Sequence, residues 1–328
     1  LNLPPLQSDG VNFTRLLDQS GSEVDKTYLT ARQTALVQAL HSFAPDLLIT
    51  ELYPFGRRVL ADEFLALLST AEGLTRRPVV LSSIRDILAP PSKPAKVEQP
   101  NTVLTRFYDG VLVHSDPEVI PLQSSWPVSP ELARKLHYTG FVAPALPQPH
   151  PDALGQGEIL VSAGGGSVGQ PIFRAAIEAA RKMPNRRWRL LVGGTDAKAR
   201  IAELSRLAEG VSVVLEPVRP DFRQMLPLAA ASVSMCGYNT AMDILQSGTA
   251  AVFVPFDDGK EVEQGLRGQS LSDLPAIEVL ESRALSGATL ARAVERVVAD
   301  GPRVQQVFGF DGAIQSVHIA KRLLEQRT

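Results

Sequence analysis

The chain has 328 residues, of which 44% are hydrophobic and 21% are charged, and its formal net charge is −2 at pH 7. This length suits two domains better than one, and the apolar content is sufficient for a core in each. No stripe of lysine and arginine runs along the sequence, which excludes the charge pattern typical of a nucleic-acid-binding protein. The single cysteine, Cys236, excludes an internal disulfide and a cysteine-based zinc cluster.

No apolar run approaches the roughly 20 residues that a membrane-spanning helix needs. The first residues, Leu1 to Pro5, lack the basic start and the long apolar core of a signal peptide. These features predict a cytoplasmic protein without a transmembrane segment. The sequence begins with Leu instead of Met, so we expect the natural start to lie elsewhere.

Strands and helices are predicted to alternate along the whole chain. The first half contains a helix over 27–43, a strand over 47–49, a helix over 62–72, strands over 79–82 and 110–113, and a short strand over 137–142. The second half contains a strand from Ile159, a helix from Pro171, a strand over 188–192, a helix over 196–208, strands over 211–215, 232–235 and 251–254, and helices around 290–297 and 305–324. This alternation predicts an α/β fold with parallel sheets, whose functional sites lie at the carboxyl ends of the strands.

Proline and glycine are concentrated between residues 143 and 157, where four prolines and two glycines occur. Such a composition is typical of a linker. We therefore expect an N-terminal domain of residues 1–143, a linker of residues 144–157, a second domain of residues 158–304 and a C-terminal helix of residues 305–328.

A first glycine loop follows the predicted strand that starts at Ile159. It contains Gly164, Gly165, Gly166 and Ser167, and it leads into a helix with Pro171 in its first turn. Backbone N–H groups in such a loop can approach an anion, and the helix dipole favours negative charge there. A tight turn without a ligand is the alternative. The loop lacks a P-loop lysine, and no acidic residue ends the next strand, which argues against a dinucleotide site.

A second glycine loop joins the strand 232–235 to a short predicted helix over 241–246. Gly237 would let a ligand approach the backbone, with Tyr238 and Asn239 beside it. Thr240 and Asp243 have the spacing of a capping box, which is a complete structural interpretation. The functional alternative is that the Asp243 carboxylate accepts hydrogen bonds from the two hydroxyls of a ribose. Two such loops in one half predict a shared site for a diphosphate, and hence a nucleotide-linked substrate.

Together these residues resemble the nucleotide-sugar glycosyltransferases of the GT-B fold, and in particular family 28, which includes the enzyme that adds N-acetylglucosamine to the lipid-linked peptidoglycan precursor. In that family a Gly-Gly-Ser loop holds the donor diphosphate, and a G-x-x-T-x-x-[E/D] helix start places its acidic residue on the ribose. The residues that match here are Gly165, Gly166, Ser167, Gly237, Thr240 and Asp243.

A later segment of family 28, His-Gln-x-x-Asn, contacts the donor sugar, and its counterpart here begins at Glu263. Gln264 matches the family pattern, whereas Glu263 replaces the histidine and Arg267 replaces the asparagine. The identity of the donor sugar is therefore left open. Arg267 is expected to contact phosphate or to form an ion pair with a carboxylate such as Glu263.

The whole chain also resembles a group of uncharacterised bacterial proteins described as predicted glycosyltransferases, through residues 50–58, 83–88 and 113–117. The resemblance implies two Rossmann-like domains that face a cleft. It also implies that the first strand, helix and strand of the N-terminal domain are missing from this sequence, and that the C-terminal helix packs back on the N-terminal domain.

Glycosyl transfer needs a general base for the acceptor hydroxyl and stabilisation of the leaving diphosphate. The candidates for the base, at the ends of predicted strands, are Glu51, Asp86, His114 and Asp116. Each has a structural alternative. Glu51, which we expect to be partly buried, could bond to Arg57 or Arg58, Asp86 could form a structural ion pair, and His114 could be a hydrogen-bonded core histidine.

The sequence thus predicts a glycosyltransferase of the hexosyltransferase type, with a UDP-sugar as donor and no required cofactor or metal. The acceptor is a glycan, a lipid-linked molecule or a small molecule, and peripheral contact with a membrane is compatible with the sequence. A nucleotide-sugar hydrolase or 2-epimerase on the same fold is one alternative. A non-catalytic protein that binds a nucleotide-sugar is another.

Overall fold

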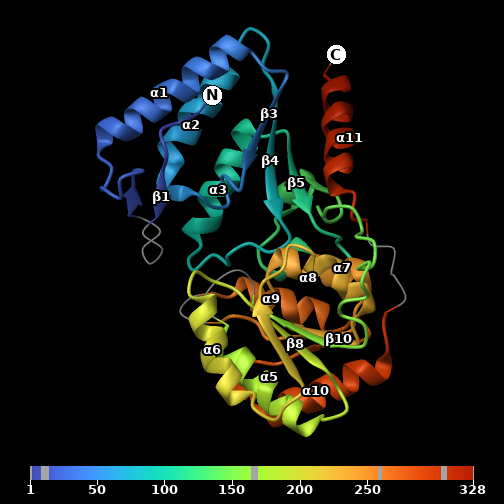
Figure 1. Ribbon diagram of the computed structural model, residues 1–328. Helices are drawn as coiled ribbons and strands as arrows, with labels where there is room; N and C mark the ends of the chain where they lie inside the picture. The colour runs from blue at the N-terminus through green and yellow to red at the C-terminus, as the bar shows by residue number, and fades with distance from the viewer. Residues whose placement is uncertain (1, 9–14, 164–168, 258–260, 304–308, 328) are drawn as a thin grey trace. The chain divides into compact units, whose positions relative to one another are not determined.

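The computed structural model describes residues 2–8, 15–163, 169–257, 261–303 and 309–327 (Figure 1). The chain divides into two compact units. Unit 1 comprises Leu1–Ser115, Ser125–Thr139 and Ala313–Thr328, and unit 2 comprises Asp116–Ser124 and Gly140–Gly312. Within the described ranges, no helix combines the length and the apolar character that crossing a bilayer requires.

Unit 1 is built around a four-stranded parallel sheet with the strand order β3-β4-β5-β6. Its strands are β3 (Leu47–Glu51), β4 (Val79–Arg85), β5 (Gly110–His114) and β6 (Leu136–Tyr138). Its helices are α1 (Lys26–Phe43), α2 (Ala61–Glu72), α3 (Ala95–Phe107) and α4 (Pro130–Ala133), and a short antiparallel pair, β1 (Gln7–Ser8) and β2 (Leu16–Leu17), precedes α1. β6 is shorter than the predicted strand over 137–142, because the chain turns at Gly140, where φ is +75°.

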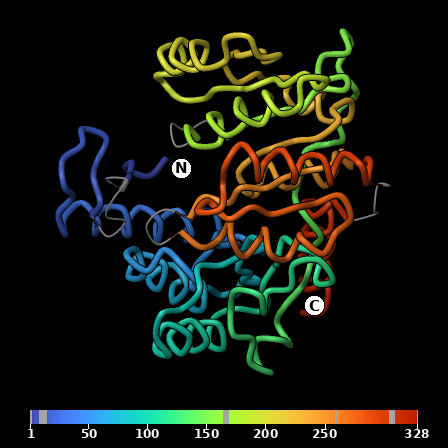
Figure 2. Tube along the Cα trace, turned by 90° about the horizontal axis from the view of Figure 1, so that it is seen from below, coloured from blue at the N-terminus to red at the C-terminus, as the bar shows by residue number. Residues whose placement is uncertain are grey.

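The last helix, α11 (Gly312–Glu325), packs on the sheet of unit 1. Ile319 and Ala320 form one buried cluster with Val79, Leu81 and Leu112, which belong to β4 and β5. In Figure 2 the red end of the trace accordingly lies among the cyan and green segments of this unit. The C-terminal helix is thus part of the unit that begins some 300 residues earlier in the sequence.

Unit 2 contains a six-stranded parallel sheet with the order β12-β11-β10-β7-β8-β9. Its strands are β7 (Ile159–Ser162), β8 (Trp188–Val192), β9 (Val213–Pro217), β10 (Ala231–Ser234), β11 (Ala251–Phe253) and β12 (Ile277–Val279). Its helices are α5 (Gln170–Lys182), α6 (Ala197–Leu207), α7 (Phe222–Met225), α8 (Tyr238–Ser247), α9 (Glu263–Leu271) and α10 (Gly287–Asp300).

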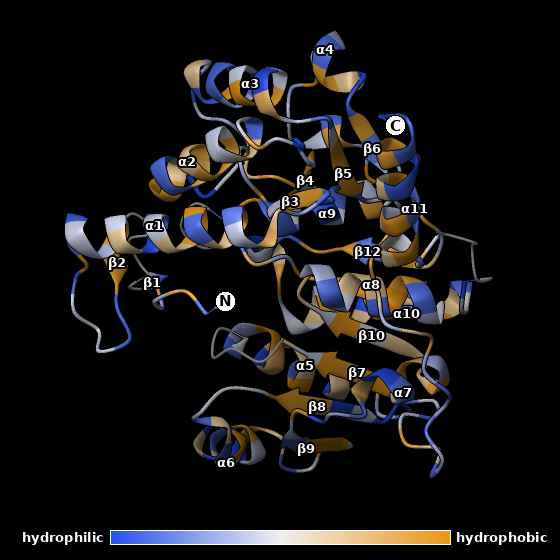
Figure 3. Cartoon of the chain, turned by 90° about the horizontal axis from the view of Figure 1, so that it is seen from above, coloured by the Kyte–Doolittle hydropathy of each residue, from blue (hydrophilic) through white to orange (hydrophobic). Residues whose placement is uncertain are grey.

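Helices cover both faces of the unit 2 sheet. Figure 1 shows α5, α6 and α10 on one face and α7, α8 and α9 on the other. The residues of β7 and β8 are accordingly buried along the whole of both strands, and Figure 3 shows the mainly hydrophobic, orange character of β7. The core includes Trp188 of β8 and Phe173 of α5, both fully buried.

Helix α5 lies unusually close to the end of β7. A Cβ atom added at Gly169, the residue before the helix, would lie 2.0 Å from the Cβ atom of Ala163 and 3.2 Å from Cε2 of Phe173. Pro171 occupies the first turn, where its missing N–H is not needed. Glycine is therefore required at position 169 by packing within the protein itself.

The residues predicted to form a linker are hydrogen-bonded to unit 2. The backbone N–H of His150 donates to the carbonyl of Gln224 at 2.9 Å, and that of Gly157 donates to Leu228 at 2.9 Å. His150 Nε2 also lies 3.1 Å from Asp221 Oδ2. The contacts place residues 140–157 in unit 2, and the division between the units falls between Thr139 and Gly140.

Candidate functional site

The strand order of unit 2 reverses between β7 and β10. These two strands are neighbours, with Ser162 opposite Ser234, and the chain continues from β7 toward β8 on one side and from β10 toward β11 on the other. In open α/β sheets, ligands bind outside the carboxyl ends of the strands at such a reversal. The two glycine loops found in the sequence follow these two strands, and the fold places the ends of β7 and β10 side by side at the expected position for a ligand.

The first loop itself, with Gly164, Gly165, Gly166 and Ser167, lies outside the described residues. Its two flanks are described. Ala163 is buried at the end of β7, and Gly169 precedes α5. The predicted contact between this loop and a diphosphate therefore stays a prediction.

The second loop differs from the prediction in where its helix begins. Helix α8 starts at Tyr238 with Gly237 as its N-cap residue, whereas the predicted helix began at residue 241. Thr240 is therefore the third residue of the helix and not its cap, and Asp243 lies in the second turn. The capping-box interpretation is wrong, because glycine occupies the cap and has no side chain to accept the N–H groups of the first turn.

Gly237 faces open space. A Cβ atom added there would have no heavy atom of the described residues within 4 Å, and the backbone angles of φ −67° and ψ 151° suit any residue. Neither the backbone at Gly237 nor the packing of the residues that the structure describes requires glycine at this position. The absent side chain instead leaves the amides of the first turn of α8 accessible to a molecule from outside, at the positive end of the helix dipole.

The loop before α8 is supported by Arg267 of α9. This side chain is almost fully buried, at 2% exposure, and its Nη1 donates to the carbonyl of Cys236 at 2.9 Å. Its guanidinium carbon lies 5.8 Å from the centre of the Tyr238 ring. The Tyr238 hydroxyl accepts a hydrogen bond from the Val142 N–H at 3.1 Å. Arg267 and Tyr238 thus stabilise the shape of the loop.

Asp243 forms an ion pair that the sequence did not reveal. Its Oδ1 accepts from Nε of Arg223, on α7, at 2.6 Å. Arg223 Nη2 also donates to Gln246 Oε1 at 2.8 Å and to the carbonyl of Ala145 at 3.2 Å. Burial raises the pKa of Asp243 above its ordinary value, while Arg223 acts in the opposite direction. Arg223 therefore favours the ionised form of a half-buried carboxylate.

The remaining predicted donor residues lie around the same edge of the sheet. Gln264 Oε1 accepts from the backbone N–H of Phe256, just after β11, at 3.1 Å. Glu263 begins α9, and its N–H donates to Glu261 Oε1 at 2.7 Å. Asn239 is exposed and Thr240 is half-buried in the first turn of α8.

The acidic residues that follow β11 include Asp257 and Glu261, and both have hydrogen-bond partners nearby in the sequence or the fold. Asp257 Oδ2 accepts from the Ser282 hydroxyl at 2.6 Å, and Glu261 accepts from Glu263. Among the described residues, no group of three or more His, Cys, Asp or Glu side chains is placed to hold a metal ion.

Glu51 is the most accessible of the candidate bases in unit 1. It ends β3, and its side chain is 58% exposed. The neighbouring residues Tyr53 and Phe55 are buried instead. The carboxylate pairs with Arg57, whose Nε lies 3.0 Å from Oε2, as the structural alternative predicted.

Asp86 and His114 are enclosed by their neighbours. Asp86 is completely buried, at 0% exposure, and accepts from the backbone N–H of Ile87 at 2.8 Å. His114 Nε2 lies 2.8 Å from Ser83 Oγ, and its Nδ1 lies 2.9 Å from Thr139 Oγ1. Burial lowers the pKa of His114, and the positive charge of Arg85 lowers it further. These contacts favour the structural interpretation of both residues.

Asp116, the fourth candidate, belongs to unit 2. Its Oδ1 accepts from the backbone N–H of Glu118 at 2.9 Å. This bond over two residues is typical of a turn.

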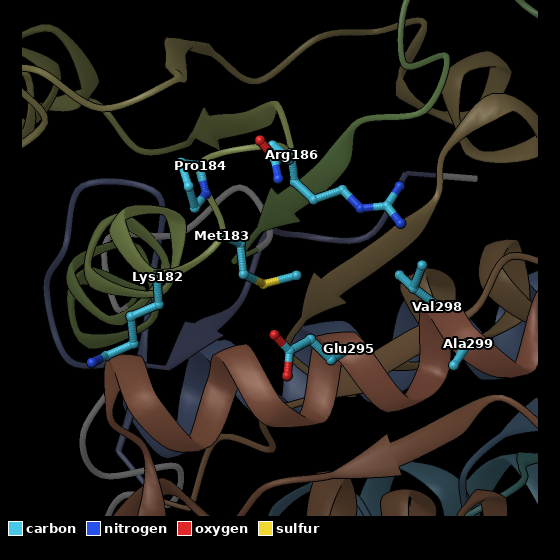
Figure 4. Close-up of a pocket in the computed structure, with 8 residues that line it drawn as sticks. Lys182, Met183, Pro184, Arg186, Glu295, Val298 and Ala299 are labelled. Carbon is cyan, nitrogen blue, oxygen red and sulfur yellow. The ribbon is translucent and has the colours of Figure 1, made fainter.

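One pocket of unit 2 lies away from this site. It has a volume of about 380 Å³ and lies between the end of α5 and α10, with Lys182, Met183 and Glu295 among its lining residues (Figure 4). The end of α5 leads into the amino end of β8. Because ligands of open α/β sheets bind at the opposite ends of the strands, this pocket is not the candidate site.

Residues 160–307 match the model of the glycosyltransferase family 28 C-terminal domain. The matched residues lie within unit 2. A comparison with curated protein sequences found no match. The resemblance to family 28-like glycosyltransferases is confirmed by this domain together with the fold.

Several solved structures share the fold of the chain. MurG of Acinetobacter baumannii aligns with a TM-score of 0.59 at 15% identity, over 92% of this chain and 80% of that one. The calicheamicin glycosyltransferase CalG4 aligns with a TM-score of 0.53 at 16% identity, over 92% and 74%. S. aureus MnaA, in a structure with UDP, aligns with a TM-score of 0.53 at 12% identity, over 90% and 81%. The two-domain GT-B fold is thus confirmed for this chain.

Proposed function

We propose that this glycosyltransferase moves a hexosyl group from a UDP-sugar to an acceptor hydroxyl, and that unit 2 binds the donor. The observation that carries the proposal is the position of the second glycine loop. It lies where the strand order reverses, it begins a ten-residue helix, and its Gly237 leaves open space that none of the described residues fills. The family 28 domain and the UDP bound to the structurally similar MnaA support the same donor class.

The diphosphate would lie against the first turns of α5 and α8. Helix N-termini present unpaired N–H groups and a partial positive charge, and both stabilise the negative charge that the diphosphate gains as it leaves. Asp243 would accept from the ribose hydroxyls through the oxygen opposite Arg223. Gln264, held by the Phe256 amide, could donate its own amide N–H to the donor sugar. We propose that this arrangement needs no metal or other cofactor.

For the general base we propose Glu51. Of the three candidates in unit 1, it alone carries a largely exposed carboxylate, and it lies at the carboxyl end of a parallel strand. Its partner Arg57 is about half exposed, so the pair can open at little cost. The acceptor could be a glycan, a lipid-linked molecule or a small molecule. The cytoplasm remains our proposed location.

Calorimetric titration of the full chain with UDP, ADP, GDP and TDP tests the donor assignment. We expect UDP to bind most tightly, with the same affinity in Mg²⁺ and in EDTA. Equal affinity for all four nucleotides, or no binding, would contradict the assignment. Product analysis with a UDP-sugar then separates the enzyme classes. Release of free sugar indicates a hydrolase, a C2-inverted sugar indicates an epimerase, and tight binding without any turnover across a panel of acceptors indicates a binding protein.

Replacing Arg223 by Gln should weaken UDP binding about tenfold, equivalent to about 1.4 kcal/mol. Without the guanidinium, burial raises the pKa of Asp243 further. The carboxylate then protonates at a higher pH, so UDP affinity should decline at a higher pH in the variant than in the wild type as the pH falls. Affinity for 2′,3′-dideoxy-UDP should hardly change, because that ligand has no ribose hydroxyls.

The matched control for this prediction is Gln246→Ala, which removes one hydrogen bond of Arg223 but keeps its ion pair with Asp243. Calorimetry at several pH values measures both variants. An Arg223→Gln variant that keeps the wild-type affinity and pH profile would show that the ion pair does not act on the ribose.

A further inference from the structure

Arg200 is a buried cation beside the start of α5. The residue belongs to the first turn of α6 and is only 7% exposed. Its Nη1 donates to the carbonyl of Gly193 at 2.8 Å, and its Nε donates to Oε1 of Gln170 at 3.3 Å. Asp196, a half-exposed carboxylate, lies 3.7 Å from Nη1, which is beyond ordinary hydrogen-bond distance. The guanidinium carbon lies 5.8 Å from the centre of the Phe173 ring.

The second terminal nitrogen of this guanidinium lacks a hydrogen-bond partner. Nη2 is buried, and in the part of the chain that the structure describes nothing accepts from it. A buried donor without a partner is costly, and more so when it carries charge. Buried polar groups are nearly always satisfied, so an exception of this kind points to a missing partner such as an ion.

The hydrogen bonds of Arg200 fix where this nitrogen lies. Gln170 is the first residue of the thirteen-residue helix α5, and Gly193 directly follows the carboxyl end of β8, the neighbour of β7. No acidic residue occurs in the first turn of α5 to offset the positive end of its dipole. A helix N-terminus and an unsatisfied guanidinium therefore meet at the edge of the sheet where the donor is proposed to bind.

We propose that Arg200 binds the diphosphate of the donor through Nη2. This inference rests on the proposed function, and it adds a residue that neither the sequence motifs nor the family pattern quoted above contains. Arginine forms short, charge-assisted hydrogen bonds with phosphate oxygens, and its planar group can keep its bond to Gly193 while Nη2 contacts the ligand. The bound anion supplies the acceptor that Nη2 lacks.

Titration calorimetry with UDP, uridine and inorganic pyrophosphate tests this assignment. Arg200→Met keeps the length of the side chain without its charge or donors. We expect this variant to bind UDP and pyrophosphate at least tenfold more weakly than the wild type and to bind uridine equally well. Arg174→Met is the matched control, because Arg174 lies on α5 but pairs with Glu203 at the surface, and it should bind all three ligands as the wild type does.

Thermal unfolding provides a second readout. UDP and pyrophosphate should raise the melting temperature of the wild type and of Arg174→Met by the same amount, and that of Arg200→Met much less. A structural role for Arg200 predicts the opposite pattern. In that case unliganded Arg200→Met would melt at a lower temperature than the wild type, and its affinities for UDP and uridine would fall by equal factors. That result would overturn the assignment.

The outcomes also separate this inference from the proposed function. If Arg200→Met binds UDP as tightly as the wild type while Asp243→Asn does not, the donor site stands and the role of Arg200 is wrong. If the wild type binds pyrophosphate through Arg200 but shows no preference for UDP, the anion contact stands and the nucleotide-sugar function is wrong. If the wild type binds neither UDP nor pyrophosphate, both are wrong.

Discussion

Gly169→Ala is expected to destabilise unit 2 by about 3 kcal/mol, the upper part of the range for overpacking a core contact. The added methyl group would lie 2.0 Å from the Cβ atom of Ala163 and 3.2 Å from the Phe173 ring, so α5 must move away from the end of β7. Both neighbours are buried, which leaves little room for local adjustment. Denaturant unfolding, followed by a probe in unit 2, measures the change in the free energy of unfolding.

Gly265→Ala is the control for this prediction. Gly265 lies in α9 and an added Cβ atom meets nothing within 4 Å, so alanine should leave stability unchanged or raise it by about 0.5–1 kcal/mol. If Gly169→Ala were as stable as the control, the close approach of α5 to the end of β7 would be wrong.

Gly237→Val should have the reverse effect, with a small change in stability and a large loss of donor binding. The side chain would enter open space, and the backbone angles suit valine, so the cost comes from the poorer N-cap and should not exceed about 1 kcal/mol. The same side chain would cover the amides of the first turn of α8. UDP affinity, measured by calorimetry, should therefore fall at least tenfold, equivalent to about 1.4 kcal/mol.

Gly169 and Gly237 should thus differ in what they are required for: Gly169 for the packing of the fold and Gly237 for binding of the donor. Gly265→Ala again serves as the control and should bind UDP like the wild type. A Gly237→Val variant with wild-type UDP affinity would mean that the ligand does not approach the start of α8. A variant that unfolded instead would show that glycine at this position serves the fold.

Much of the fold could be predicted from the sequence because its apolar strands are short and continuous. The strands β7, β8, β10 and β11 all lie where buried runs of residues predicted them, and their order makes β7 and β10, the strands before the two loops, neighbours. Helix α3 was not predicted, since Pro100 lies within it and proline is normally a helix-breaking signal. The start of α8 was misplaced because Thr240 and Asp243 have capping spacing, while the actual cap is glycine.

The partners of the site residues could not be predicted, because they come from distant parts of the chain. Arg223 reaches Asp243 from α7, and Arg267 reaches Cys236 from α9, 31 residues away. The unsatisfied nitrogen of Arg200 is likewise visible only in three dimensions. Sequence spacing identifies residues that share a local motif, whereas these contacts depend on how the helices pack on the sheet.

The exposure of the candidate bases could not be predicted from the sequence either. The ends of β3, β4 and β5 were predicted correctly as places for polar groups, but exposure differs completely among them. Glu51 is exposed and Asp86 is fully buried, although both follow apolar strands. The difference arises because the loop after β3 buries its aromatic residues and leaves the carboxylate outside.

A crystal structure of the full chain with UDP would test the central claim most directly. The account predicts the diphosphate within hydrogen-bond distance of the backbone amides at the start of α8, close to Gly237, with the ribose at Asp243. UDP bound elsewhere, for example in the pocket beside Lys182 and Glu295, would contradict it.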